Sequence, residues 1–163
     1  AVDRIDHEWS SRAVTLVEYR STGTYVMAHA DTLLEALDEG MLKVQSLSCS
    51  KYVQPHKERV AYWDTSFSAI QTVVEVWLAA QRKWVYIEPL FVSHAGGGDA
   101  GAARTDIARQ LSVEAMRFNS ADATWRNMME EVRKAPRLMD VASKKWLVES
   151  FTVISAQVRL LNP

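Results

Sequence analysis

Four histidines are the side chains of this sequence that most readily bind a metal ion. They are His7, His29, His56 and His94, and no two of them lie four residues apart, the spacing that places two ligands on one face of a helix. None of them has a cysteine or a carboxylate at the spacing of metal ligands. We therefore predict no metal site in this chain.

Cys49 is the only cysteine and the only thiol that could act as a nucleophile. An internal disulfide is therefore excluded, which is typical of proteins from the reducing cytosol. Cys49 lies in the run SLSCSK, where no histidine or acid has a catalytic spacing and the serines lack the nucleophile-elbow pattern. We expect it to be a small buried or half-buried residue. Glu130 and Glu131 are adjacent, so on a helix they would point about 100° apart and would not form a working carboxylate pair.

A glycine-rich run, HAGGGDAGAAR over residues 94–104, contains the spacing GxGxxG at Gly96, Gly98 and Gly101. A dinucleotide site needs a strand before these glycines and a helix that opens at the last one, but a long helical pattern precedes them here. A phosphate-binding loop needs Lys and then Ser or Thr after Gly101, and two alanines follow instead. The sequence therefore predicts a flexible loop over 94–104 that binds no cofactor.

The composition is that of an ordinary globular chain. Its 163 residues are 48% hydrophobic and 24% charged, with a formal net charge of −1. This length allows one domain with a hydrophobic core, and the near-neutral charge argues against a nucleic-acid partner. No apolar run approaches the roughly 18 residues of a membrane span, and the N-terminus lacks the apolar core of a signal peptide. The missing initiator Met leads us to expect a segment of a longer chain or a processed N-terminus.

The hydrophobic period predicts the elements that must position any site. Two extended runs around the turn RSTG predict a β-hairpin over 13–29, which must lie against other elements to be stable. Beyond it the apolar spacing becomes three and four, and Thr32 with Glu35 fits a capping box. The helices are expected at about 32–49, 55–93, 112–134 and 143–161. Residues 1–163 then form one mainly α segment, an elongated antiparallel helical bundle with one long central helix and a small N-terminal β-hairpin.

The longest predicted helix, 55–93, carries an apolar seam at heptad spacing. Its stripe is wide, so we expect burial between several helices. Pro89 should kink or end this helix near Val85, whose carbonyl loses its donor. The residues that we assign to the structural core of the segment are Trp63, Phe67, Ile70, Val74, Trp77, Trp84, Phe91, Phe118 and Trp125.

Polar residues interrupt the seam at Gln81 and Glu88. Polar groups within an apolar seam must find partners, and those partners can belong to the core or to a second body. Arg82 and Lys83 could contact phosphate, although two cations on a helix flank are typical of a solvated edge. If a partner binds here, the contact residues that we predict are Gln81, Arg82, Lys83, Tyr86 and Glu88.

The run WLAAQRKWVYIEPLF, residues 77–91, resembles the linker of dynein heavy chains, where a helix carries the pattern W-(L/I)-x-x-Q-x-x-W-x-Y-L-E-x-I-F. The resemblance extends over about residues 16–142. Two departures stand out. The run HAGGGDAGAART lengthens a connection that is short in the family, and Ser112, itself a good N-cap, replaces the usual proline. The other matching residues are Leu37-Asp38, Gln45-Ser46-Leu47, Ser50-Lys51-Tyr52-Val53, Trp63, Asp106-Ile107, Gln110-Leu111, Glu114, Arg117-Phe118, Trp125 and Met128-Met129.

This resemblance implies a mechanical role. The linker of a dynein is a helical bundle that lies across the AAA+ ATPase ring and carries the power stroke as it bends and straightens. The implied partners are the ring and the remaining linker of the same heavy chain, while the parent chain binds microtubules and other dynein subunits. ATP and magnesium would bind in the ring, so we expect no catalytic, cofactor or metal residue in this segment.

The forms EPLF and KYVQP favour an axonemal heavy chain, in the cytoskeleton of a cilium or flagellum and not at a membrane. The expected localisation is therefore the cytoplasm and its cytoskeleton, in the axoneme. The alternative is a free-standing helical interaction or spacer domain of the spectrin-like kind. An enzyme is a third class, but the sequence contains no motif that indicates one.

Overall fold

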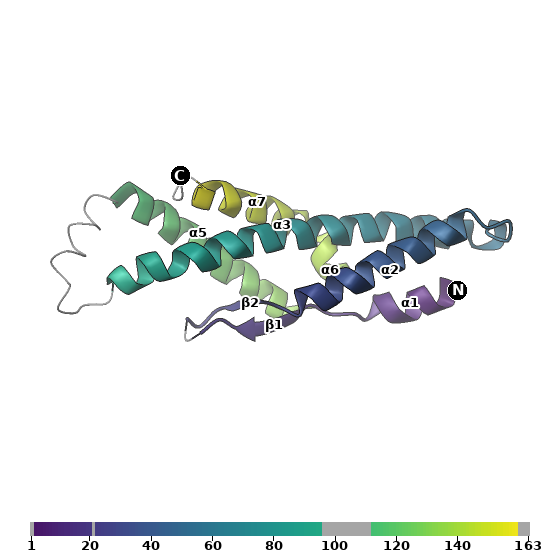
Figure 1. The fold of residues 1–163 in the computed structure, drawn as a ribbon, viewed down its shortest axis with the longest axis horizontal. Coiled ribbons are helices and arrows are strands. Elements are labelled where there is room, and N and C mark those ends of the chain that lie inside the picture. The colour runs from purple at the N-terminus through teal and green to yellow at the C-terminus, as the bar shows by residue number, and fades with distance from the viewer. Residues whose placement is uncertain (1, 21, 96–111, 160–163) are drawn as a thin grey trace.

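The computed structural model describes residues 2–20, 22–95 and 112–159, of which 91–95, 112 and 159 are described by their backbone alone. It confirms the prediction of an elongated, mainly helical bundle with one long helix and a small N-terminal hairpin (Figure 1). In chain order the elements are α1 Val2–Ser10, β1 Thr15–Glu18, β2 Tyr25–Ala28, α2 Ala30–Ser48, the short 3-10 turn η1 Gln54–His56, α3 Lys57–Ala95, α5 Ser112–Lys134, α6 Leu138–Ser143 and α7 Lys145–Arg159.

The long helix α3 is the axis on which the other elements pack. Figure 1 shows α2 antiparallel to the first half of α3, while α5 and α7 cover its second half. The short α6 packs on α3 between these two halves, and α1 lies beside α2 near the N-terminus. One helix therefore joins two bundles into a single body.

Helix α3 continues through Pro89 to Ala95, so the prediction that the proline ends the helix near Val85 is wrong. Trp84 and Ile87 are buried on either side of the position where the helix was expected to stop. Burial of two large side chains in this turn offsets the loss of one backbone hydrogen bond. The other possibility, a kink at Pro89, stays a prediction.

The prediction of a capping box at Thr32 and Glu35, at the start of α2, is also wrong. The helix begins at Ala30, and its N-cap is His29, which has a left-handed backbone (φ 57°, ψ 37°) and makes no side-chain capping bond. Strand β2 ends at Ala28, so the left-handed residue turns the chain from strand into helix within one position. Docking of the hairpin, and not a local cap at Thr32, therefore determines where α2 starts.

Two short helices are absent from the sequence-based prediction. Helix α1 has nine residues and buries Val2, Ile5 and Trp9 at a spacing of three and four. Helix α6 has six residues and buries Leu138 and Val141. Single short helices have little stability of their own, so tertiary packing must stabilise both.

The β-hairpin pairs Leu16 with Met27 in an antiparallel register. Of the side chains on β2, Val26 and Met27 are buried. The segment before β1 also pairs with the connection between α5 and α6, since the Val14 N–H donates to the Pro136 carbonyl at 2.7 Å. These contacts supply the support that a two-stranded hairpin needs.

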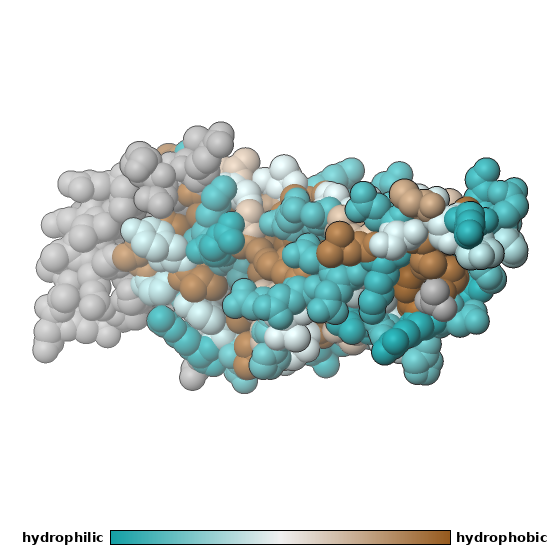
Figure 2. Space-filling view, turned by 45° about the vertical axis from the view of Figure 1, so that its right-hand side comes forward, coloured by the Kyte–Doolittle hydropathy of each residue, from teal (hydrophilic) through white to brown (hydrophobic). Residues whose placement is uncertain are grey.

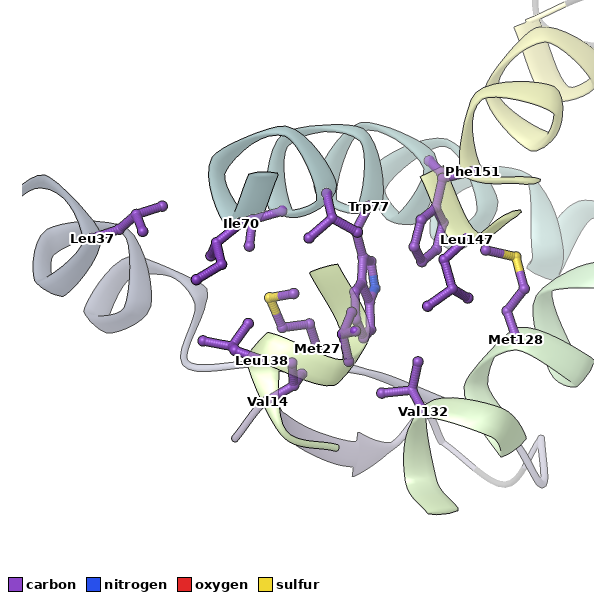
Figure 3. Packing of buried hydrophobic residues seen from close by; sticks show 14 of the residues in the cluster. Val14, Met27, Leu37, Ile70, Trp77, Met128, Val132, Leu138, Leu147 and Phe151 are labelled. Carbon is purple, nitrogen blue, oxygen red and sulfur yellow. The ribbon is translucent and has the colours of Figure 1, made fainter. Parts of the chain in front are cut away.

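The seam of α3 forms the core, and large aromatic rings dominate it. Trp84 stacks on Trp125 of α5 with ring centroids 5.2 Å apart, and Trp77 stacks on Phe151 of α7 at 5.1 Å. Figure 3 shows Trp77 at the centre of a cluster to which the hairpin, α5, α6 and α7 all contribute. The side chain of Phe91 lies outside the described residues. The other residues that we assigned to the core are buried: Trp63, Phe67, Ile70, Val74, Trp77, Trp84, Phe118 and Trp125.

The glycine-rich loop predicted over 94–104 falls almost entirely outside the described residues. His94 and Ala95 are the last residues of α3, and Gly96, Gly98 and Gly101 lie in the part that is not described.

Candidate functional site

Gln81 is the first polar residue in the seam, and its side chain bonds to the hairpin. Its Oε1 accepts from the Met27 backbone N–H at 2.7 Å, and its Nε2 donates to the Met27 carbonyl at 3.2 Å. The indole N–H of Trp77 donates to the same Oε1 at 3.0 Å. The amide thus pairs with β2 as a neighbouring strand would, so the hydrogen-bonding partners of Gln81 lie inside the segment.

Trp84 also has a polar partner within the bundle. Its indole N–H donates to Asp122 of α5 at 3.0 Å, and Arg126 donates to the other oxygen of that carboxylate at 2.9 Å. Arg126 reaches further to the backbone carbonyl of Thr22 at the tip of the hairpin. One chain of polar contacts therefore joins α3, α5 and the hairpin.

Glu88 lies one helical turn beyond Trp84 and is only 3% exposed. Burial raises the pKa of its carboxyl group above the ordinary value, and the negative charge of Asp122 acts in the same direction. The positive charges of Arg20 and Arg126 lower that pKa. Glu88 is therefore buried within the described part of the segment.

The remaining three predicted contact residues face outward. Arg82 is exposed, Lys83 is half-buried and Tyr86 is 61% exposed. The structure thus divides the five residues, with the amide of Gln81 and the carboxylate of Glu88 inside and these three outside. Contact with a partner stays a prediction for all five residues.

Cys49 is exposed, so the expectation of a buried or half-buried thiol is wrong. It is the C-cap residue of α2, and its backbone N–H closes the last helical turn on Gln45 and Leu47. The helix ends at the surface near the connection to α3, which leaves the side chain outside the core.

A second polar cluster, which is absent from the sequence-based predictions, holds α1 against the start of α3. Asp6 accepts hydrogen bonds from Arg59 and from the indole N–H of Trp63. These bonds hold the pKa of the Asp6 carboxyl below its ordinary value. No sequence signal links Asp6 to Arg59 across 53 positions. By contrast, Asp122 and Arg126 are spaced four apart on one helix, a pattern that could have been found.

Within residues 2–20, 22–95 and 112–159, no three His, Cys, Asp or Glu side chains gather into a group able to hold a metal ion. None of the helices in this part of the chain combines the length and the apolarity that crossing a membrane requires.

Comparison with known proteins identifies the family. The family model described as dynein heavy chain, N-terminal region 2, matches residues 1–162. The chain belongs to the dynein heavy chain family. This confirms the resemblance to dynein heavy chains that the run at 77–91 first indicated.

Curated dynein heavy chains show the same similarity. The dynein axonemal heavy chain 1 of Mus musculus is 33% identical over 150 residues, which cover 92% of this chain and 3% of that protein. The dynein axonemal heavy chain 10 of Homo sapiens is 34% identical over 140 residues, which cover 83% of this chain and 3% of that protein. The chain therefore spans about 3% of the length of these relatives. Their names support the axonemal preference.

Proposed function

We propose that this dynein segment is part of a force-transmitting lever that rearranges across the ATPase ring of its heavy chain. The observation that carries the proposal is the continuous core along α3. A lever must transmit strain, and closely packed interiors deform little. Stacked aromatic pairs tie α3 to α5 and α7, and hydrogen bonds tie it to the hairpin and α1.

The segment has no catalytic role in this proposal. ATP and magnesium bind in the ring of the parent chain, and the segment itself hydrolyses no ATP. Its partners are that ring and the remaining linker, and the parent chain moves along microtubules in the axoneme of a cilium or flagellum. Membership of the dynein family supports this reading over a free-standing spectrin-like spacer, which no particular observation favours.

An exposed cation on α3 allows the proposal to be tested. Arg82→Ala in the complete heavy chain removes a side chain that faces outward and makes no ion pair with the described residues. If Arg82 contacts the ring, microtubule gliding should slow by up to about fivefold, because such a polar contact contributes up to about 1 kcal/mol. The melting temperature of the segment should not change.

Lys145→Ala is the matched control, since Lys145 is an exposed cation on α7. It should leave both gliding speed and melting temperature unchanged. Equal gliding speeds for the two variants would contradict the proposed contact. Unfolding of the segment by Arg82→Ala would show instead that Arg82 is structural.

A further inference from the structure

The two strands of the hairpin each have an outer edge, and side chains of the described helices bond to the edge of β2. The backbone of Met27 bonds to Gln81 of α3. The Tyr25 carbonyl accepts from the indole N–H of Trp125 of α5 at 3.1 Å. Side chains thus take the place of a neighbouring strand on β2. Figure 1 shows β1 on the other side of β2, at the lower margin of the molecule.

The backbone hydrogen bonds show which groups of β1 point outward. In an extended strand, the N–H and C=O groups of successive residues point to opposite sides. The Tyr19 N–H donates across the hairpin, so the odd-numbered residues of this strand face β2. The even-numbered residues face the opposite side, where the Val14 N–H donates to the Pro136 carbonyl. The backbone groups of Leu16 and Glu18 therefore lie on this outer side.

The outer edge of β1 is open over these two residues. Within the part of the chain that the structure describes, no hydrogen bond joins the outward groups of Leu16 or Glu18 to another residue. Between them, Val17 is 49% exposed. The same extended segment already pairs with a second one just before β1, where Ala13 and Arg137 form an antiparallel bridge. The open groups continue that row of pairing sites.

Alternating backbone donors and acceptors of this kind fit another extended backbone, because an added strand supplies complementary groups at the same repeat. The side chains narrow the choice. A β-branched or aromatic residue packs well opposite Val17, and Lys or Arg complements Glu18, which makes no ion pair with a described residue. Figure 2 shows a mostly hydrophilic surface along the lower margin of the molecule, so hydrogen bonds and charge contribute more here than apolar burial.

We infer that the outer edge of β1 binds an extended strand of a separate polypeptide, with a β-branched or aromatic residue opposite Val17 and Lys or Arg opposite Glu18. A second copy of this chain fits less well. In the symmetric antiparallel pairing centred on Val17, Leu16 of one copy lies opposite Glu18 of the other, so neither carboxylate meets a cation. The inference depends on neither the lever function nor the ring contact of Arg82.

Hydrogen exchange in the assembled dynein complex and in the purified complete heavy chain tests the inference. The amides of Leu16 and Glu18 should exchange at least about tenfold more slowly in the complex, because strand pairing protects them until the pair opens. The Val17 amide is the internal control, since it faces β2 and its exchange should change little. Equal exchange of Leu16 and Glu18 in the two samples, whether fast or slow, would overturn the inference. Equal slowing of all three amides would show general burial and would also overturn it.

A charge variant gives a second readout in the same complex. Glu18→Gln keeps the outward backbone groups and removes the charge. The Leu16 amide should then exchange up to about fivefold faster, because a cross-strand ion pair contributes up to about 1 kcal/mol. Glu39→Gln is the matched control, since Glu39 is an exposed acid on α2. Equal exchange of Leu16 in the two variants would contradict the predicted cation.

Photo-cross-linking identifies the strand. A photo-cross-linking amino acid in place of the exposed Thr15 leaves the outer backbone groups of β1 unchanged. In the complex it should link to a separate polypeptide, at a peptide that has Lys or Arg beside a β-branched or aromatic residue. The same amino acid at Thr152, which is exposed on α7, is the control. Links only to the same heavy chain or to a second copy would overturn the inference, as would the absence of any link specific to position 15.

Discussion

At the scale of single residues, Trp84 combines an apolar and a polar role. Its ring is fully buried, stacks on Trp125 and makes an edge-to-face contact with Tyr19, with ring centroids 5.4 Å apart, while its N–H donates to Asp122. Trp84→Ala should lower the free energy of unfolding by about 3–5 kcal/mol, as deletion of a buried aromatic ring does. Urea unfolding followed by fluorescence measures this loss.

Trp84→Phe weighs the two roles against each other, because it keeps an aromatic ring against Trp125 but removes the N–H together with part of the indole ring. We expect a loss of about 1–2 kcal/mol, since Asp122 retains Arg126 as a partner. If both variants lost the same free energy, the hydrogen bond and not the stacking would dominate.

Glu88 gives the stability of the segment a pH dependence of its own. Its pKa is raised in the folded state, so the folded protein binds this proton more tightly than the unfolded chain. The unfolding free energy that Glu88 contributes is therefore greatest below the ordinary pKa of 4.5 and falls as the pH rises through the folded-state value.

Glu88→Gln removes this titration. The difference in unfolding free energy between the wild type and this variant should decline as the pH rises above about 4.5, as measured by urea unfolding at several pH values. A difference that grows with pH would mean that Arg20 and Arg126 stabilise the ionised carboxylate more than burial destabilises it.

At the scale of elements, Gly40 determines how closely α2 approaches α3. A Cβ atom at Gly40 would lie 2.8 Å from a ring carbon of Phe67 and 3.3 Å from the indole nitrogen of Trp9. Phe67 has little room to move, because Trp9 and Trp63 pack on its ring at 4.9 and 5.6 Å. Gly40→Ala should therefore destabilise the segment by about 1–3 kcal/mol, although alanine favours a helix by about 1 kcal/mol.

A double-mutant cycle locates the cause of that loss. Phe67→Leu removes the ring carbons that the new methyl group would meet. In the Phe67→Leu background, Gly40→Ala should lower the free energy of unfolding by less than it does in the wild type, or should even raise it. The coupling free energy from thermal or urea unfolding should exceed about 0.5 kcal/mol. If the losses of the two single variants simply added up in the double variant, the loss in Gly40→Ala would not come from a clash with Phe67.

At the scale of the whole molecule, the lever proposal predicts that core packing and motor output are coupled. Phe151 joins α7 to Trp77 and Trp125, so Phe151→Ala loosens the link between α7 and two aromatic residues of the core. In the complete heavy chain this variant should glide microtubules more slowly, while ATP hydrolysis by the ring continues. Thr152→Ala is the control, because Thr152 is exposed on the same helix. Loss of hydrolysis together with gliding would argue against a purely mechanical role.

The sequence by itself determined the helical seam of the long helix, the hairpin and the family. Each depends on local spacing: Trp63 to Trp84 repeat at three and four, and the hairpin alternates around a short turn. Short elements such as α1 and α6 carry too few residues for such a period to stand out.

Only the tertiary structure decided which partners the polar residues of the seam bond to and where α2 begins. Gln81 bonds to a strand 54 positions away, and His29 takes a left-handed backbone so that α2 can follow the docked hairpin. Spacing along one helix does not encode the position of a distant backbone group. A groove between α2 and α3 likewise exists only once the two helices lie side by side, because each contributes one wall.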